Sequence, residues 1–249
     1  MHERNLLLTL SYDGTEFNGW QIQASGRTVQ GVLEQALSKR HGERTTVIPA
    51  GRTDTGVHAV GQRVGFRSRI ESIPLQKYPA AINSLLPRDV RVTACSEVSA
   101  DFHARYDALS REYRYYILPA TVADPCYDRY AWAFPGSLDL RRMNRLAGMV
   151  VGEHDFAGFA VRTAEVKSTV RCVSSAGFYP EGRFVVFRVV ATGFLWRMVR
   201  SLVGSIVTMH EERSEVFTEA LRSGVRPLSL ESAPARGLFF HRVRYEHES

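Results

Sequence analysis

The order of strand-like and helix-like segments constrains the fold of this chain more than any other feature. The first hundred residues follow the order β-α-β-β-α-β, with strand patterns at 6–12, 45–50, 63–70 and 90–94 and helical patterns at 29–37 and 75–86. Thr28 is a suitable N-cap for the first helix. In segment 63–70, apolar residues alternate with Arg63, Arg67 and Arg69, which predicts a half-buried strand with an arginine face.

A similar order recurs after Asp101, without similarity in sequence. Its expected elements are a strand at 111–118, a helix at 138–151, paired strands at 166–179 and 183–191, helices at 194–209 and 215–222, and a strand at 237–245. We therefore expect an α+β fold of two ferredoxin-like halves, residues 1–104 and 105–249. The helices of each half would cover one face of an antiparallel sheet and leave the other face open for a ligand.

The charge of the chain favours a polyanionic partner. It has 32 basic and 26 acidic residues, and only Lys39, Lys77 and Lys167 are lysines, so 29 are arginines. The planar guanidinium suits phosphate and base stacking, although a GC-rich genome would also encode arginine in place of lysine. Cys95, Cys126 and Cys172 form no C-x-x-C pair, so neither a disulfide framework nor a zinc site is indicated. No apolar run reaches about 20 residues, and we expect a soluble, cytoplasmic protein without membrane association.

One loop has a composition typical of a catalytic site: Ala50-Gly51-Arg52-Thr53-Asp54-Thr55-Gly56-Val57-His58-Ala59. It places a carboxylate between a guanidinium, hydroxyls and two glycines, which allow turns that strain other residues. The simplest interpretation makes Asp54 a turn residue or a helix cap. A phosphate loop is excluded, because Val57 and His58 stand where that motif requires Lys and Ser or Thr.

Two catalytic interpretations of Asp54 remain. Asp54-Thr55-Gly56 is also the triplet of aspartic proteases, but no second copy occurs in the chain, and Arg52 would oppose the sharing of a proton between two carboxylates. Alternatively, an ionised Asp54 acts as a nucleophile or electrostatic stabiliser at a sugar carbon. The loop offers no second carboxylate as an acid, so the leaving base would need little protonation or would never truly leave.

The loop at 51–59 resembles the central motif of the tRNA pseudouridine synthase A family. Further resemblances cover nearly the whole chain, at 12–21 (Y-D-G-T-E-F-N-G-W-Q), 27–30 (R-T-V-Q), 83–92, 102–105, 111–115, 198–200 (M-V-R) and 203–204. An ordered set of this length is far more specific than a single D-T-G triplet.

The resemblance implies an enzyme that isomerises uridine to pseudouridine at positions 38, 39 and 40 of the tRNA anticodon stem-loop, without cofactor or metal. It implies two ferredoxin-like halves that share one antiparallel sheet with a central active-site cleft. It also implies a homodimer in which tRNA touches both subunits. The target base must be flipped out of its stack, at a cost of about a few kcal/mol.

Roles for individual residues also follow from the resemblance. Asp54 matches the nucleophile, which attacks or stabilises C1′, with attack on the uracil ring as the competing route. Arg52 holds the flipped nucleotide and its phosphate, Arg200 pairs with the catalytic carboxylate, Tyr113 stacks on the target base, and Leu238 lines the uracil pocket. Taken alone, Tyr113 and Leu238 fit core strand positions equally well. His58 and His103 lie in matching motifs without an assignable role.

Six arginines are candidates for phosphate contacts, which position a nucleic acid without reading its sequence: Arg63, Arg67, Arg69, Arg105, Arg111 and Arg114. Each could equally be solvated surface. The main alternative function is a non-catalytic RNA-binding protein of the same fold. The joint presence of Arg52, Asp54, Tyr113 and Arg200 argues against it, since a protein without activity has no need of four dispersed polar groups.

Overall fold

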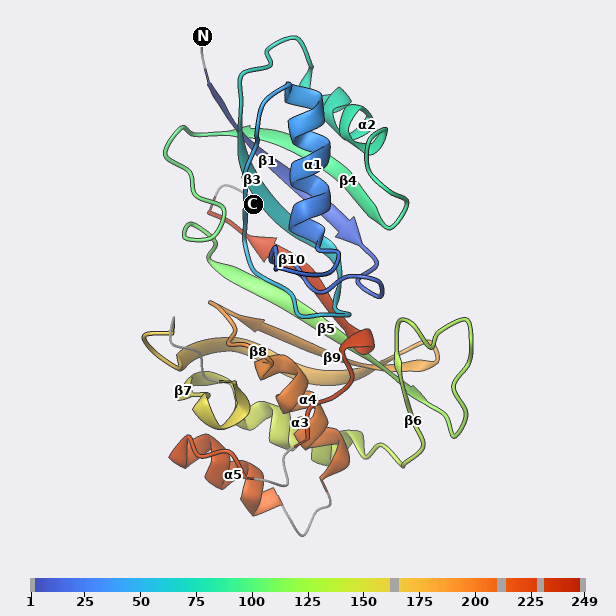
Figure 1. Ribbon diagram of the computed structural model, residues 1–249. Helices are drawn as coiled ribbons and strands as arrows, with labels where there is room; N and C mark the ends of the chain where they lie inside the picture. The colour runs from blue at the N-terminus through green and yellow to red at the C-terminus, as the bar shows by residue number, and fades with distance from the viewer. Residues whose placement is uncertain (1–2, 162–165, 210–213, 228–230, 247–249) are drawn as a thin grey trace. The chain divides into compact units, whose positions relative to one another are not determined.

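The computed structural model describes residues 3–161, 166–209, 214–227 and 231–246 (Figure 1). It divides into two compact units. Unit 1 comprises residues 1–109 and 240–249, and unit 2 comprises residues 110–239. The chain therefore leaves unit 1 at residue 109 and returns to it with its last strand, whereas the sequence pattern alone grouped that strand with the second half.

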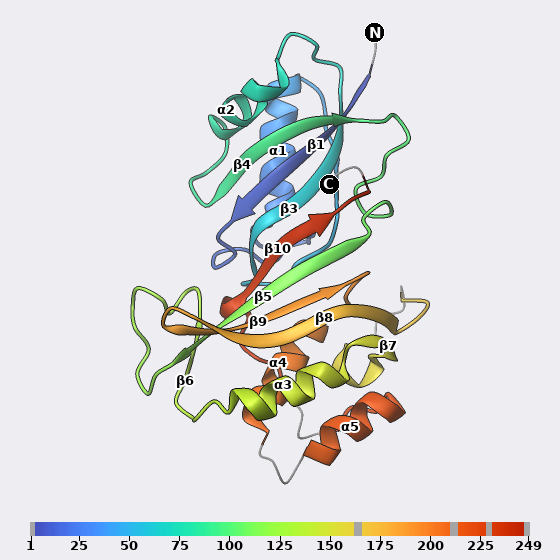
Figure 2. The same ribbon diagram turned by 180° about the vertical axis from the view of Figure 1, so that it is seen from behind.

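Unit 1 has the predicted order β-α-β-β-α-β, followed by the returning strand. Its elements are β1 (Arg4–Tyr12), α1 (Val29–His41), β2 (Val47–Pro49), β3 (His58–Ser68), η1 (Leu75–Lys77), α2 (Tyr78–Asn83), β4 (Val90–Val98) and most of β10 (Leu238–Arg244). The strands lie in the order β4-β1-β3-β10, and β2 also pairs with β3. Helices α1 and α2 lie on one face of these strands, and the view from behind shows the opposite face without a helix (Figure 2).

Helix α1 forms where its sequence predicts. The Thr28 hydroxyl accepts a hydrogen bond from the Gly31 N–H at 3.3 Å, and Gly42 ends the helix in the left-handed conformation, with φ of 71°. Its buried side chains, Val29, Leu33, Ala36 and Leu37, share one face and pack on the sheet.

Strand β3 has the predicted arginine face. Gln62, Val64, Phe66 and Ser68 are buried on one side, whereas on the other side Arg63 is half-buried and Arg67 exposed. The strand starts at His58, five residues earlier than expected, because its pairing with β1 continues across a bulge to Tyr12 and Ala59. Arg69 lies just after the end of the strand.

Unit 2 is also α+β. It contains β5 (Ser110–Pro119), β6 (Trp132–Phe134), α3 (Leu140–Met149), β7 (Gly152–Asp155), η2 (Ala157–Phe159), β8 (Val170–Glu181), β9 (Phe184–Ala191), α4 (Met198–Thr208), α5 (Ser214–Ser223) and η4 (Ala235–Gly237). The strands lie in the order β5-β9-β8-β7. The expected purely antiparallel sheet is wrong here, because β6, which has no clear sequence pattern, pairs in parallel with β5.

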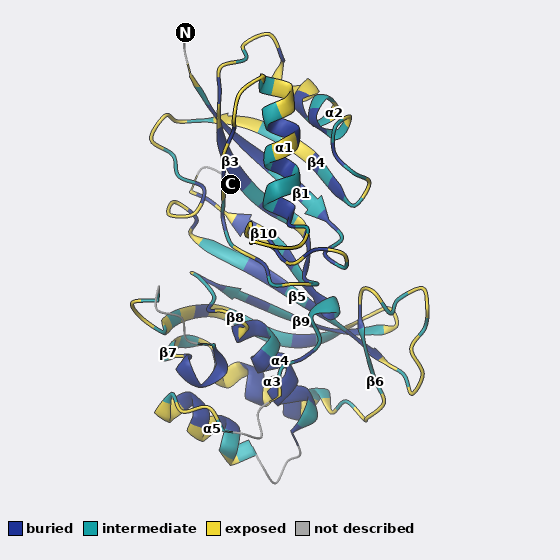
Figure 3. Ribbon diagram, in the orientation of Figure 1, coloured by how far each residue is buried: buried dark blue, intermediate teal, exposed yellow. Residues whose placement is uncertain are grey.

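The α+β class predicted from the sequence is thus confirmed, with local differences in element bounds. Helix α4 starts four residues later than expected, because Arg197 before it adopts a left-handed backbone with φ of 62°. Buried residues lie along the strands, on the inward side of α1 and over most of α4 (Figure 3). No helix in the described part of the chain is long and apolar enough to cross a membrane.

Candidate functional site

The Asp54 loop connects β2 to β3 within unit 1. The Val57 N–H donates to the Asp54 carbonyl at 3.1 Å, and Gly56 has a positive φ of 75°, so the chain turns sharply just after the carboxylate. Arg52 is exposed and Asp54 half-buried, two residues apart on the same loop. The carboxylate therefore stands on a tight turn, with a guanidinium on the segment that leads into it.

Segment 13–20 holds the backbone of this loop through hydrogen bonds and close contacts. The Trp20 N–H donates to the Thr53 carbonyl at 3.0 Å, and the Gly56 N–H donates to the Phe17 carbonyl at 3.3 Å. A Cβ at Gly14 would lie 2.0 Å from the Val57 carbonyl oxygen, and one at Gly19 would lie 2.6 Å from that of Thr53. Both positions require glycine, because the backbone of the Asp54 loop comes too close to leave room for a Cβ.

Buried aromatic side chains form the base of the support. Phe17 and Trp20 are each 1% exposed, and Tyr12 is 3% exposed with its hydroxyl 2.8 Å from the Thr53 Oγ1. Burial raises the pKa of Tyr12 to about 12, so its phenol stays protonated and able to bond Thr53. The backbone that leads to Asp54 is therefore fixed on an apolar platform.

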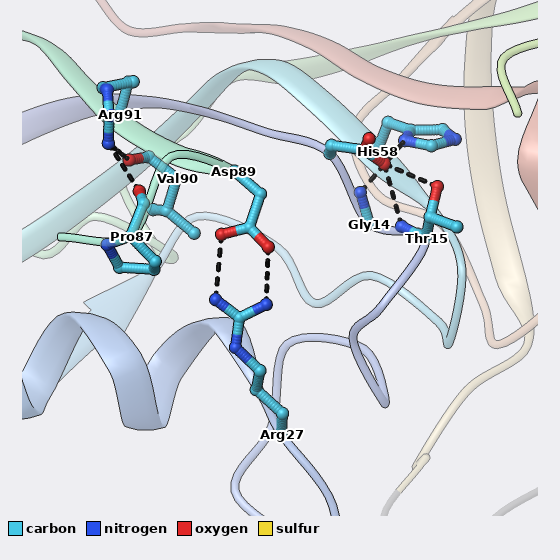
Figure 4. A network of polar contacts seen from close by, with 9 residues as sticks. Gly14, Thr15, Arg27, His58, Pro87, Asp89, Val90 and Arg91 are labelled. Carbon is cyan, nitrogen blue, oxygen red and sulfur yellow. Dashed lines mark hydrogen bonds and ion pairs between the residues drawn. The ribbon is translucent and has the colours of Figure 1, made fainter.

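His58, for which the sequence suggested no role, ties the exit of the loop to the same segment. It is fully buried, its Nδ1 accepts a hydrogen bond from the Gly14 N–H at 3.0 Å, and that nitrogen lies 3.2 Å from the Asp13 Oδ1. Thr15 donates to the same carboxylate oxygen through its N–H at 3.0 Å and its hydroxyl at 2.6 Å (Figure 4). His103, in contrast, organises a turn, with Nδ1 accepting from two backbone N–H groups.

Arg27 and Asp89 form an ion pair that sequence reasoning missed. Two guanidinium nitrogens donate to the two carboxylate oxygens at 2.5 and 2.8 Å (Figure 4), and the guanidinium carbon lies 4.1 Å from the centre of the Phe17 ring. The hydrogen bond from Arg27 lowers the pKa of Asp89 below its usual value. Both residues lie in motif segments, 27–30 and 83–92, which was the available signal.

The other candidate site residues belong to unit 2. Tyr113 on β5 is buried. Its ring and that of Phe194 form a T-shaped pair, with ring centroids 4.9 Å apart. Leu238 is buried at the start of β10. Arg200 lies half-buried in the first turn of α4, where its Nε donates to the Ala233 carbonyl at 2.9 Å.

The six candidate phosphate-binding arginines are not equivalent. Arg67 and Arg69 line a hollow of about 340 Å³ in unit 1, whose lining also includes Arg44. Several donate to protein oxygens: Arg63 to Thr9 Oγ1, Arg67 to the Ala100 carbonyl, Arg69 to Glu43, Arg111 to the Thr192 carbonyl and Arg114 to Glu112. Arg105 is exposed, with its guanidinium 5.9 Å from the Tyr106 ring.

A carboxylate on a tight turn whose backbone is held in place can act as a nucleophile or stabilise a cationic carbon. Among the residues that the structure describes, no three His, Cys, Asp or Glu side chains form a group suited to a metal ion. All three cysteines are free thiols. The Asp54 loop therefore stands out as the candidate centre for chemistry.

Comparisons with a family model and with known proteins all match this chain to the same family. A family model described as tRNA pseudouridine synthase matches residues 9–107 and 146–246. A protein of Moorella thermoacetica named tRNA pseudouridine synthase A is 42% identical over 244 residues, which cover 96% of this chain and 99% of that one. Proteins of the same name from Treponema denticola and Chlorobaculum tepidum are 38% and 41% identical, over 99% and 98% of this chain and 95% and 98% of theirs.

Proposed function

Because the chain belongs to the tRNA pseudouridine synthase family, we propose that it isomerises uridine to pseudouridine at positions 38, 39 and 40 of the tRNA anticodon stem-loop. The observation that carries this proposal is the Asp54 loop, in which Trp20, Gly14 and Gly19 hold the backbone beside the carboxylate in one conformation. A nucleophile held in place in this way gains the advantage of proximity and orientation.

The reaction can be written around the Asp54 carboxylate. A carboxylate oxygen bonds to C1′ of the flipped uridine while the C1′–N1 bond breaks. The electron pair of the broken bond remains on the uracil. The trapped uracil then turns, C5 bonds to C1′, and the bond between C1′ and the aspartate oxygen breaks. C5 finally loses its proton and N1 gains one, so atoms and charge balance. Attack of Asp54 on the uracil ring is the alternative route, and chemical trapping of the intermediate distinguishes the two.

The remaining site residues are assigned roles by their motif positions. We expect Arg52 to hold the flipped nucleotide and its phosphate, and Arg200 to pair with the carboxylate. Tyr113 would stack on the uracil and Leu238 would line its pocket. Two observations support these roles: the Tyr113 ring packs against the Phe194 ring in a T-shaped arrangement, and the Ala233 carbonyl orients the Arg200 guanidinium through Nε.

RNA binding and assembly complete the proposal. Arg63, Arg67, Arg69, Arg105, Arg111 and Arg114 are proposed to contact phosphates, which position the tRNA without reading its sequence. A homodimer, with tRNA touching both subunits, is proposed from family membership. Light scattering with and without tRNA measures the assembly state, and one protein chain per particle in both, after the mass of the tRNA is subtracted, would contradict a dimer. Since its substrate is tRNA, we expect the enzyme to work in the cytoplasm.

The decisive test uses unmodified tRNA transcripts without added metal or nucleotide. Pseudouridine is mapped by carbodiimide-dependent reverse-transcription stops after incubation with wild type, Asp54→Ala, or the control Glu71→Ala, which removes an exposed carboxylate of unit 1. We expect stops in the anticodon arm with wild type and the control only. Asp54→Ala should keep tRNA affinity within about tenfold, because its carboxylate serves chemistry more than phosphate binding.

Other outcomes select other functions. Stops outside the anticodon arm would keep the chemistry and overturn the substrate position. Tight tRNA binding without stops would favour the non-catalytic RNA-binding protein. Inhibition by a peptide transition-state mimic, with no effect of RNA, would indicate an aspartic protease.

A further inference from the structure

Trp196 and Arg197, the two residues before α4, form an exposed pair of an aromatic ring and a cation. The Trp196 side chain is 47% exposed, whereas Trp20 is 1% exposed. The guanidinium carbon of Arg197 lies 5.4 Å from the centre of the Trp196 ring. An indole is the largest stacking surface among side chains, so its exposure next to a cation calls for a ligand.

The backbone under this pair is both fixed and strained. Arg197 is the one non-glycine residue with a positive φ, at 62°, in the part of the chain that the structure describes. Hydrogen bonds hold the turn, from the Val161 N–H to the Trp196 carbonyl at 3.0 Å and from the Met198 N–H to the Leu195 carbonyl at 3.1 Å. A glycine would adopt this conformation without strain. The presence of arginine indicates that its side chain is used.

Neither side chain is needed for the core. The neighbours Leu195, Met198 and Val199 are 7%, 0% and 4% exposed and anchor the segment in unit 2. Trp196 and Arg197 are exposed between them. The turn therefore presents two side chains outward from a rigid base.

The same short segment adjoins two residues with proposed roles at the active site, Tyr113 and Arg200. Phe194 packs on Tyr113 at 4.9 Å, and Arg200 follows Arg197 by three residues in the first turn of α4. A ligand stacked on Tyr113 would thus bind to the part of unit 2 that presents the exposed pair.

We propose that Trp196 and Arg197 form a stacking platform for an unpaired base of the RNA substrate, an inference that rests on the tRNA substrate proposed above. The indole stacks on a base face, which every nucleotide offers, and the guanidinium adds a cation near the ring and the phosphate. An unpaired nucleotide next to the flipped uridine would stack on this platform. The loop of the RNA would then stay open while the target base is out of its stack.

Binding of a labelled anticodon stem-loop RNA, measured by fluorescence anisotropy, tests the platform. Trp196→Ala should weaken binding about five- to 150-fold, the range that corresponds to loss of one stacked base, whereas Trp196→Phe should stay within about threefold of wild type. Val122→Ala, at another exposed apolar residue of unit 2, and Arg222→Ala, at an exposed cation of unit 2, serve as controls and should not change affinity.

Arg197→Gly separates the platform from a structural role. Glycine relieves the left-handed backbone, so the variant should melt no lower than wild type, while RNA binding falls because the guanidinium is lost. A structural role alone would predict that stability and binding change together. Intrinsic tryptophan fluorescence should also be quenched by the RNA in wild type and much less in Trp196→Phe.

Two results would overturn the platform, and a third would separate it from the proposed reaction. Unchanged RNA affinity of Trp196→Ala, with normal pseudouridine formation, would refute the platform and leave the proposed function intact. Loss of self-association in Trp196→Ala, with RNA affinity unchanged, would assign the pair to a protein interface instead. Trp196-dependent RNA binding without any pseudouridine formation would support the platform and refute the proposed reaction.

Discussion

The Arg27–Asp89 ion pair gives the sharpest prediction about how the Asp54 loop is held. It joins the residue before the N-cap of α1 to the residue before β4, and its guanidinium lies over Phe17. The Phe17 carbonyl in turn accepts a hydrogen bond from Gly56 in the loop. We therefore expect Arg27→Gln and Asp89→Asn to loosen the loop as well as to destabilise unit 1.

The expected magnitude follows from partial burial. The Arg27 and Asp89 side chains are 36% and 28% exposed, so solvent screens the pair and its value lies near the upper end of the range for surface pairs, about 1 kcal/mol. The contact with Phe17 adds about 0.5 to 1 kcal/mol to the role of Arg27. Arg27→Gln should thus lower the free energy of unfolding by about 1.5 to 2 kcal/mol, and Asp89→Asn by about 1 kcal/mol.

Denaturant unfolding of wild type, both single variants and the double variant measures the coupling between the two residues. We expect a coupling energy of about 1 kcal/mol at pH 7. The exposed pair Arg222–Glu219, whose side chains are 79% and 55% exposed, is the matched control and should couple by less than about 0.5 kcal/mol. Additive effects at Arg27 and Asp89, within about 0.3 kcal/mol, would refute the reasoning.

The pH dependence supplies a second check. The Arg27 hydrogen bond lowers the pKa of Asp89 in the folded protein, so the pair stabilises the fold fully above the unfolded value of about 3.9. That stability is lost as the pH falls through the lower folded value. The difference between wild type and Asp89→Asn should therefore shrink below about pH 4. In both single variants, turnover per folded molecule at saturating tRNA should fall by a larger factor than tRNA affinity, with the folded fraction taken from the denaturation curve. An unchanged turnover per folded molecule would indicate a general loss of folded protein only.

Three further predictions use other contacts. Gly14→Ala should lower the free energy of unfolding by about 2 kcal/mol or more, since its Cβ would lie 2.0 Å from the Val57 carbonyl oxygen, and denaturation within about 0.5 kcal/mol of wild type would contradict this. Burial raises the pKa of Glu112, but hydrogen bonds from Arg188 and Arg114 outweigh it and lower the value overall. Glu112→Gln should thus cost about 1 to 3 kcal/mol at pH 7 and less as the pH falls below about 4, measured by denaturation across pH. Titration of tRNA affinity against salt should give a steep negative slope, reduced by about one when one arginine of the phosphate set is replaced, and a flat response would rule that set out.

Local elements of this fold could be predicted from the sequence, whereas elements defined by distant partners could not. The cap at Thr28 and the arginine face of β3 depend on neighbouring residues, and both are found as expected. Strand β6 has three residues and exists because β5 offers an edge, which no local pattern records. The late start of α4 depends on hydrogen bonds that hold Arg197 in a conformation no arginine prefers.

The candidate site shows the same division. The motif around Asp54 identifies the carboxylate, but it does not show what holds it. Gly14 and Gly19 look like ordinary turn residues until the carbonyls of Val57 and Thr53 are seen against them. Arg27 and Asp89 lie far apart in the sequence and meet only through the tertiary fold.

The path of the chain also bears on biosynthesis. β1 occupies one edge of β3, and the other edge is covered by β2 and β10, of which β2 reaches only Val64 to Phe66. β10 follows all of unit 2 in the chain, so a ribosome working at about 5 to 20 residues per second would leave most of that edge unpaired for on the order of ten to thirty seconds. An exposed strand edge is a template for pairing with other chains. The nascent protein is therefore most vulnerable to aggregation while unit 2 is being made, and chaperones that shield strand edges would act on it in that interval.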